Sequence, residues 1–218
     1  MKKHFLFATL ILSGSLFISC GNSNKSTEEG ETEDTGIIEK ISGTADAVKG
    51  LSALEETMKD IQAQTDALKT KTPLSNDELK KILPEELDGL KRKSIRLGES
   101  ASLGVSSADA SYSNEDKSKT IDISIMDGAG ESASSIAALA FMGYNVDSEE
   151  INENRTEKTT DFKGQRAKLT ESQDHGEQNA KIEWIQKKRY LMKLEGKGYS
   201  IDQLGSVMEN LALGGLKE

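Results

Sequence analysis

The stretch Ile121-Asp122-Ile123-Ser124-Ile125-Met126 decides the fold of this 218-residue chain. Successive side chains of a strand point to opposite faces of a sheet, so isoleucine at every second position is typical of a strand with one buried face. Asp127 and Gly128 follow, and residues 131–142 then change to the apolar spacing of a helix. The sequence therefore predicts a strand that leads directly into a helix.

Weaker strand patterns lie on both sides of this segment. Residues 101–113 are rich in Ser and Ala and precede a hairpin turn at 114–117. Four further candidate strands follow the helix, at residues 157–162, 166–171, 179–186 and 189–195. We expect an α+β fold in which an antiparallel sheet of about six strands carries helices on one face.

Two short helices are expected at the ends of this domain, which spans residues 73–218. Ser75 and Glu78 have capping-box spacing at the start of the first, and Ser200 and Gln203 at the start of the second. Apolar residues follow each box at helical spacing. Gly214-Gly215 is expected to end the second helix.

A long amphipathic helical arm is predicted over residues 37–72, before Pro73 stops it. Its apolar stripe consists of Leu51, Leu54, Met58, Ile61, Thr65 and Leu68. Spacings of three and four place these residues on one face. Self-association of two copies through residues 37–72 and packing of the helix on its own domain both fit this pattern.

The first 19 residues have the form of a secretory signal peptide. Lys2-Lys3 precede an apolar run from Phe5 to Ile18, which is shorter than the roughly 20 residues needed to span a bilayer. The stretch Leu16-Phe17-Ile18-Ser19-Cys20 resembles the lipobox of bacterial, in particular Gram-negative, lipoproteins. That resemblance implies cleavage before Cys20 and attachment of a diacylglyceryl group to its sulfur. The alternative is an ordinary signal peptide with an incidental cysteine.

Cys20 is the single cysteine of the chain, so it has no intramolecular disulfide partner. Acyl chains on this residue would anchor the protein at a membrane surface. Residues 20–36 contain almost no apolar side chains and are expected to form a disordered, lipidated tether. Gly21 stands where aspartate is the usual inner-membrane retention signal. The resemblance therefore implies an outer-membrane, lipid-anchored location, on the periplasmic face or the cell surface.

The net charge of the chain restricts the classes of partner that it is expected to bind. Removal of Lys2 and Lys3 leaves 26 basic against 37 acidic residues, which gives a net charge near −11. An acidic protein repels phosphate backbones and anionic lipids, so we expect no nucleic-acid partner. The acyl chains on Cys20 are therefore expected to provide the membrane attachment.

The phrase from Leu83 to Arg92, LPEELDGLKR, resembles the opening of an uncharacterised family of bacterial envelope domains. In that family it precedes a tyrosine-containing strand, a strand ending in Asp-Gly, and a closing helix. The matching positions here are Tyr112, Ile123 to Gly128, and Gly198 to Leu204. The resemblance covers residues 73–213 and implies no particular activity.

Catalytic and metal-binding signals are weak. His175 is the one histidine left after cleavage, and it lies in a polar turn, so we expect the protein not to be an enzyme. The GxGxxA spacing of residues 128–133 matches either a dinucleotide loop or a glycine turn, and the glycine turn is favoured. Residues 147–154 are either a solvated acidic loop or a calcium site. No cofactor is expected, and no Cys/His cluster indicates zinc.

Two basic groups, Lys91-Arg92-Lys93 with Arg96 and Lys187-Lys188-Arg189, are either solvated turns or docking points for an acidic partner. Together these features predict a membrane-anchored envelope lipoprotein that acts as a non-catalytic binding or scaffolding module for an envelope protein. The alternative is a carrier that holds a small hydrophobic ligand between the sheet and its helices. A deep apolar cavity near Trp184 would favour the carrier.

Overall fold

The computed structural model describes residues 45–100, 105–174 and 176–218. Apart from residues 45–47, these belong to one compact unit, Val48–Glu218. The expected signal peptide, Cys20 and the tether lie outside the described residues, as does His175. No helix in the described ranges is long and apolar enough to cross a membrane.

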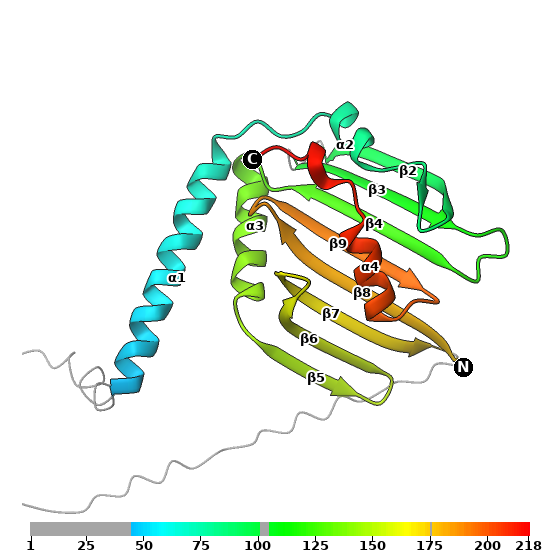
Figure 1. Ribbon diagram of the computed structural model, residues 1–218. Helices are drawn as coiled ribbons and strands as arrows, with labels where there is room; N and C mark the ends of the chain where they lie inside the picture. The colour runs from blue at the N-terminus through cyan, green and yellow to red at the C-terminus, as the bar shows by residue number, and fades with distance from the viewer. Residues whose placement is uncertain (1–44, 101–104, 175) are drawn as a thin grey trace, which may run out of the picture. The chain divides into compact units, whose positions relative to one another are not determined.

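The fold is α+β, as expected, and its centre is an antiparallel sheet (Figure 1). Nine strands are described: β1 (Glu86–Leu87), β2 (Leu90–Ser100), β3 (Val105–Ser113), β4 (Thr120–Asp127), β5 (Ser148–Asn152), β6 (Arg155–Phe162), β7 (Gln165–Asp174), β8 (Glu177–Gln186) and β9 (Tyr190–Lys197). The prediction of about six strands was wrong because β1, β2 and β5 lie at the sheet edges or next to them. Their largely exposed, charged residues lack the apolar alternation of central strands.

The sheet consists of two meanders joined at its middle. Its strand order is β1-β2-β3-β4-β9-β8-β7-β6-β5, and every neighbouring pair is antiparallel. Strands β4 and β9 pair at the junction, where Ile123 lies opposite Leu194. The chain leaves β4 through α3, reaches the far edge at β5, and returns strand by strand to the middle. Segments far apart in sequence therefore lie side by side at β4 and β9.

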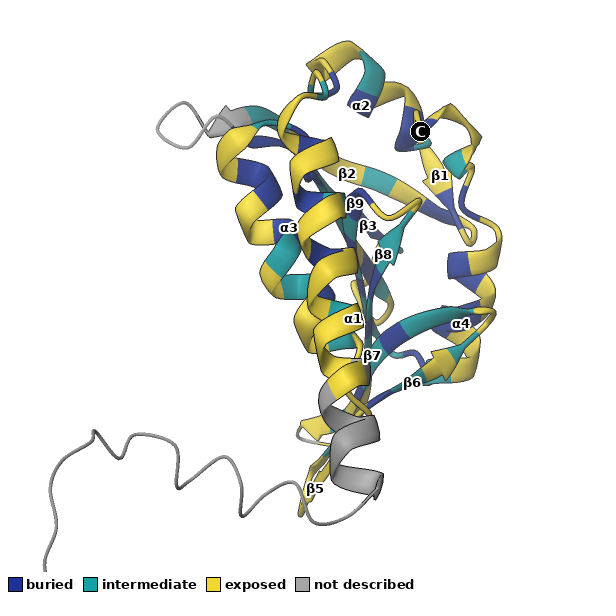
Figure 2. Cartoon of the chain, turned by 90° about the vertical axis from the view of Figure 1, so that its left-hand side faces the viewer, coloured by how far each residue is buried: buried dark blue, intermediate teal, exposed yellow. Residues whose placement is uncertain are grey.

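Helices pack on both faces of the sheet. They are α1 (Ala45–Lys69), α2 (Asn76–Ile82), α3 (Glu131–Tyr144) and α4 (Ile201–Glu209), with a 3-10 turn, η1, at Leu213–Gly215. Figure 2 shows α1 and α3 on one side of the sheet and α2 and α4 on the other. The expectation that helices cover one face was wrong.

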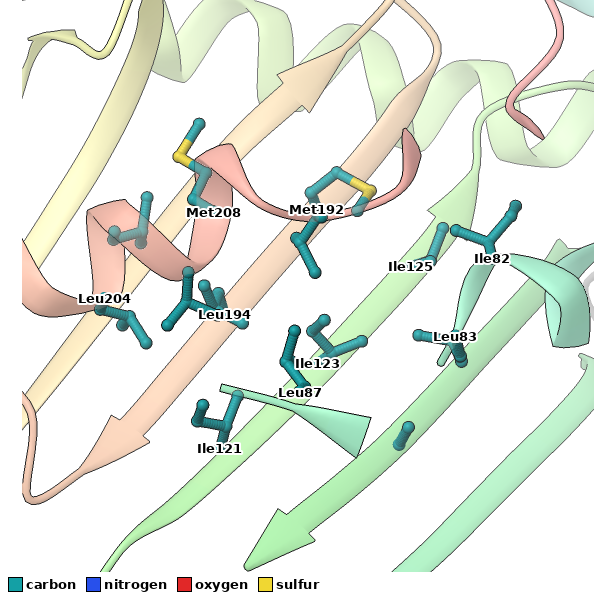
Figure 3. Packing of buried hydrophobic residues seen from close by; sticks show 14 of the residues in the cluster. Ile82, Leu83, Leu87, Ile121, Ile123, Ile125, Met192, Leu194, Leu204 and Met208 are labelled. Carbon is teal, nitrogen blue, oxygen red and sulfur yellow. The ribbon is translucent and has the colours of Figure 1, made fainter. Parts of the chain in front are cut away.

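The main core lies between the sheet and the α2/α4 layer (Figure 3). Ile121, Ile123 and Ile125 of β4 point into it, as the alternation predicts. They meet Ile82 of α2, Leu204 and Met208 of α4, and Met192 and Leu194 of β9. Burial of this continuous apolar face supplies most of the driving force for the fold.

The α1/α3 side of the sheet has a smaller core. It joins Ile61 and Leu68 of α1 to Ala137 and Phe141 of α3, with Ile185 and Leu191 of the sheet packed against them. Elsewhere this face carries mainly Ser, Thr, Lys, Glu and Asp side chains. Because each strand contributes few apolar residues to this face, the sequence pattern did not reveal that helices also cover it.

Both capping boxes are confirmed. Ser75 caps α2 with Glu78, and Ser200 caps α4 with Gln203. The predicted C-terminal limit of the last helix was wrong, because α4 ends at Glu209. The Asn210 N–H satisfies carbonyls of the final turn, and the chain then forms η1, which contains Gly214-Gly215.

Candidate functional site

A buried ion pair between Asp127 and Arg189 fixes the chain around the candidate site. Asp127 lies at the end of β4 and Arg189 directly before β9, and both are almost fully buried. Arg189 Nε donates to Asp127 Oδ1 at 2.7 Å, and Nη2 donates to Oδ2 at 2.8 Å. The pKa of Arg189 is raised by this hydrogen bond to Asp127. The bidentate geometry is the strong form of an arginine–carboxylate contact.

Backbone groups form further hydrogen bonds with this pair. Asp127 accepts hydrogen bonds from the N–H groups of Leu74, at 2.8 Å, and Ala129, at 3.0 Å. Arg189 also donates to the carbonyl of Thr72 at 2.9 Å. The pair therefore ties the segment after α1 to β4 and to the β8–β9 turn. Its polar groups are engaged within the chain, so its role is to position these elements.

The Gly128 to Ala133 segment has a packing role in the same region. Gly128 N–H donates to the Arg189 carbonyl at 3.0 Å, and a Cβ at Gly128 would lie 2.6 Å from that oxygen. Gly130 precedes α3 with φ of 95°, a conformation that favours glycine. Since the sheet is antiparallel, the βαβ unit of a dinucleotide site is absent from the described strands. The glycine-turn interpretation of GxGxxA agrees with this geometry.

The largest hollow described lies beside this pair, and we call it the α1 groove. Its volume is about 570 Å³. It is bounded by α1, the C-terminal end of α3, and the β6–β7 and β8–β9 turns. Its lining residues are Thr57, Asp60, Ile61, Gln64, Phe141, Tyr144, Asn145, Gly164, Gln165, Arg166, Ile185, Lys187 and Lys188.

The α1 groove has an apolar floor. Ile61 and Phe141 are buried, and Ile185 packs against them from β8. Tyr144 adds a half-buried ring, and desolvation, assisted by the charge of Glu183, raises the pKa of its hydroxyl to about 12. A neutral phenol above an apolar floor is suited to contacts with apolar or amphipathic groups.

The rim of the α1 groove carries three cations, Arg166, Lys187 and Lys188, and one carboxylate, Asp60. Arg166 donates to the Tyr144 carbonyl at 3.0 Å and to Asp147 at 2.7 Å, and its pKa is raised by the Asp147 hydrogen bond. Lys187 donates to the Leu216 carbonyl at 2.7 Å and pairs with the Glu218 carboxylate at 3.4 Å. Lys188 is exposed, and its ammonium has no partner among the described residues. Lys188 is therefore a cation at the rim that is available to a bound group.

The β8–β9 turn holds its lysines in an unusual backbone conformation. Lys187 and Lys188 both have φ of 52°, in the left-handed region where residues with a Cβ are disfavoured. Gln64 of α1 donates to the Lys188 carbonyl at 2.7 Å, and Arg189 N–H donates to Gln186 at 3.1 Å. These contacts fix the turn against α1. Strained, well-supported residues of this kind are often part of a functional surface.

The other predicted basic group, Lys91-Arg92-Lys93 with Arg96, does not form a docking surface of this kind. Arg92 is half-buried and donates to the Leu83 carbonyl at 2.6 Å and the Pro84 carbonyl at 3.1 Å, so it holds the segment after α2. A register shift between Arg92 and Ser94 breaks the regular alternation around Lys93. The sequence cluster therefore does not form one continuous basic face.

The acidic segment 147–154 is a strand and a turn, so its interpretation as a loop was wrong. Glu149 and Glu150 are successive residues of β5 and point to opposite faces. Asp147 is paired with Arg166. Within the described ranges, no three His, Cys, Asp or Glu side chains are grouped to hold a metal ion.

Trp184 does not line a ligand cavity among the hollows described. Its side chain is fully buried in the main core, and its Nε1 donates to Gln186 Oε1 at 3.1 Å. It lies between Ala167 of β7 and Met192 of β9 in the sheet register. The space around Trp184 is occupied by core side chains, which counts against a carrier site there.

The uncovered part of the α1/α3 sheet face is a weaker candidate. A hollow of about 450 Å³ there is lined by polar residues of β4, β6, β7, β8 and β9. Its charges are paired within the sheet, for example Lys181 with Glu183 at 2.9 Å and Lys197 with Glu177 at 2.8 Å. A ligand would have to replace these contacts, so the α1 groove is the better candidate.

Sequence patterns pointed to part of this site. They singled out the Lys187-Lys188 turn and the α1 stripe that contains Ile61. They did not single out Gln64, Phe141 or Ile185 as site residues, because these are brought together only by the α3 crossover. The detectable signal was the apolar spacing of residues 131–142, which predicted the helix α3 but not where it packs on the sheet.

Comparisons with known proteins give a distant structural match. No protein-family model matches the sequence, and no curated protein matches it. Among solved structures, a GTP binding regulator from Thermotoga maritima aligns with 61% of this chain and 83% of its own length. The sequence identity is 12% and the TM-score is 0.32. A similarity at this level does not support transfer of function, so the function of this chain is inferred from its own residues.

Proposed function

We propose that this protein is a non-catalytic binding module of the bacterial cell envelope, held at the outer membrane by acyl chains on Cys20, with the α1 groove as its partner-binding surface. The observation that carries the proposal is the groove itself. It combines an apolar floor of Ile61, Phe141 and Ile185 with a basic rim at Lys187 and Lys188. Such a surface suits an amphipathic segment of a partner protein that carries acidic side chains.

The charge at the rim supports a protein partner. The chain carries 37 acidic against 28 basic residues, and Lys188 at the rim has no carboxylate partner among the described residues. An acidic partner would be guided to this rim and repelled elsewhere. The apolar floor would then supply the buried centre of the contact.

Two carboxyl groups near the surface have lowered pKa values. Hydrogen bonds to Gln62 and to Lys168 lower the pKa values of Asp66 and Glu157, respectively. A carboxyl that acts as a general acid near neutral pH needs the opposite shift. These carboxylates are therefore suited to ion pairing.

The proposed anchor is tested by metabolic labelling with palmitate in the native host. We expect label on the wild-type chain and none on Cys20→Ala. Membrane fractionation of the same two proteins should move Cys20→Ala to the soluble fraction. An unlabelled wild-type chain would remove the anchor from the proposal.

The proposed binding surface is tested by crosslinking intact cells with a lysine-reactive reagent, followed by mass spectrometry. We expect crosslinks from Lys187 or Lys188 to peptides of an envelope protein. Lys117, an exposed residue of the β3–β4 turn, is the matched control in the same spectra. Equal linkage of the partner to Lys117 would contradict a specific role for the α1 groove.

A second candidate function is transport or storage of a small amphipathic ligand in the same groove. A volume of 570 Å³ falls in the usual range of small-molecule sites, about 300–1,000 Å³. Native mass spectrometry of the purified chain would detect such a ligand as added mass. Gln64→Trp, which places a large ring in the groove, should abolish that mass if the ligand lies there.

A further inference from the structure

The outer surface of α3 differs from every other exposed helix surface described. Residues 132–144 contain no charged side chain, although 30% of the whole chain is charged. Three large apolar side chains of this helix reach solvent: Ile136 is 36% exposed, Leu139 71% and Met142 44%. By contrast, α1 exposes Leu54 and Met58 among charged residues such as Glu55. A helix that is apolar on all sides normally has both sides covered.

These exposed residues form one strip along the helix. At about 100° per residue, Leu139 lies opposite the buried stripe of Ala133, Ala137 and Phe141. Ile136 and Met142 lie symmetrically on either side of Leu139, each about 60° away around the axis. We call Ser132, Ser135, Ile136, Leu139, Met142 and Gly143 the outer strip of α3; all six are exposed.

We propose that the outer strip of α3 binds the same strip of a second copy of this chain, as an antiparallel helix pair with its two-fold axis at Leu139. In that register Ile136 faces Met142 of the second copy, and Ser135 faces its Gly143. Large apolar residues thus meet large ones, and small residues meet small ones, which lets the helices approach closely. The strip is complementary to itself.

The absence of charge selects a second copy over a charged partner. In a two-fold contact, residues near the axis meet their own counterparts, so any charge there would face a like charge. The net charge of the chain is −9, and two copies would repel through most other surfaces. The outer strip is an uncharged surface on which this repulsion is least.

The size of the strip sets the strength of the contact. A helix of 14 residues is about 21 Å long, so one helix face provides less than the roughly 800 Å² per partner of a standard interface. The dimer should therefore be weak in dilute solution. Acylation of Cys20, which is part of the proposed function, would confine both copies to one surface and raise their effective concentration.

Disulfide trapping tests the contact without acylation. The chain has one cysteine, so Cys20→Ser gives a thiol-free background. In residues 20–218 of that background, Leu139→Cys places a thiol on the proposed axis, and mild oxidation should give a covalent dimer. Lys80→Cys, on the exposed side of α2, is the matched control and should stay largely monomeric. Equal dimer yields at both positions, or none at residue 139, would overturn the proposal.

A charge exchange tests the register. In the Leu139→Cys chain, Ile136→Lys alone and Met142→Glu alone should each reduce the dimer yield about tenfold, since each buries an unpaired charge at the contact. Together they should restore it, because Lys at 136 would face Glu at 142 of the second copy. Failure of the double variant to recover, with an unchanged urea midpoint, would overturn the antiparallel pair.

Discussion

Arg189→Met should destabilise the fold strongly, because it leaves the Asp127 carboxylate buried without its cation. The substitution keeps an unbranched side chain of similar length but removes both charged hydrogen bonds, at 2.7 and 2.8 Å, and the donor to Thr72. Removal of one partner of a buried ion pair costs about 3–5 kcal/mol. That is a large part of the about 5–15 kcal/mol that holds an ordinary domain together.

Urea denaturation of residues 20–218 with Cys20→Ser provides the assay. Trp184 is the single tryptophan and is fully buried, so its fluorescence reports the main core. Arg155→Met is the matched control, because it removes a cation whose side chain is 51% exposed in its pair with Glu157. The control should cost less than about 1 kcal/mol.

A double variant separates the ion pair from the loss of packing. If Asp127→Asn is added to Arg189→Met, the buried negative charge disappears, and part of the lost free energy of unfolding should return. A cost for Arg189→Met no larger than that of the control, or strict additivity of the two substitutions, would refute this reasoning about the pair.

Three further predictions concern the same framework. Gly128→Ala places a Cβ 2.6 Å from the Arg189 carbonyl and should lower the free energy of unfolding by about 1–3 kcal/mol, whereas Gly98→Ala, with no atom within 4 Å, should not lower it. Lys188→Gly should raise the urea midpoint, by about 0.5–1 kcal/mol in free energy, because it relieves a left-handed φ; an unchanged or lower midpoint would count against strain in that turn. Burial raises the pKa of Tyr190 from 10.0 to about 12, so the neutral phenol contributes stability that is present below pH 10 and lost as pH rises toward 12. Urea unfolding at pH 9 and 11 should show this decline, and Tyr190→Phe should reduce it.

The central part of the fold was predictable because its signals are local. The isoleucine alternation of β4 and the capping boxes at Ser75 and Ser200 each depend on a few neighbouring residues. The predicted positions of these elements therefore lie close to the observed ones. Strands β2 and β5, near the two ends of the sheet, were missed because their residues are largely exposed and often charged, and because their pairing partners are distant from them or weakly patterned.

The candidate site was less predictable because it depends on contacts between distant segments. Gln64 and Lys188 are 124 residues apart in sequence and join through a single side-chain hydrogen bond. The Lys187-Lys188 pair was recognisable as a turn, but nothing local indicated that α1 would lie against it. Likewise, the apolar spacing of α3 predicted a helix but not that Leu139 would face solvent.

Site-specific photocrosslinking in living cells tests the proposed binding role most directly. A photoreactive amino acid at Gln64 in the α1 groove should give an adduct with an envelope protein in the otherwise wild-type, acylated chain. The same group at Glu115, in the exposed β3–β4 turn, should not give that adduct, and Lys188→Glu should reduce it. Absence of an adduct at Gln64, or the same adduct from Glu115, would contradict the α1 groove as a binding surface.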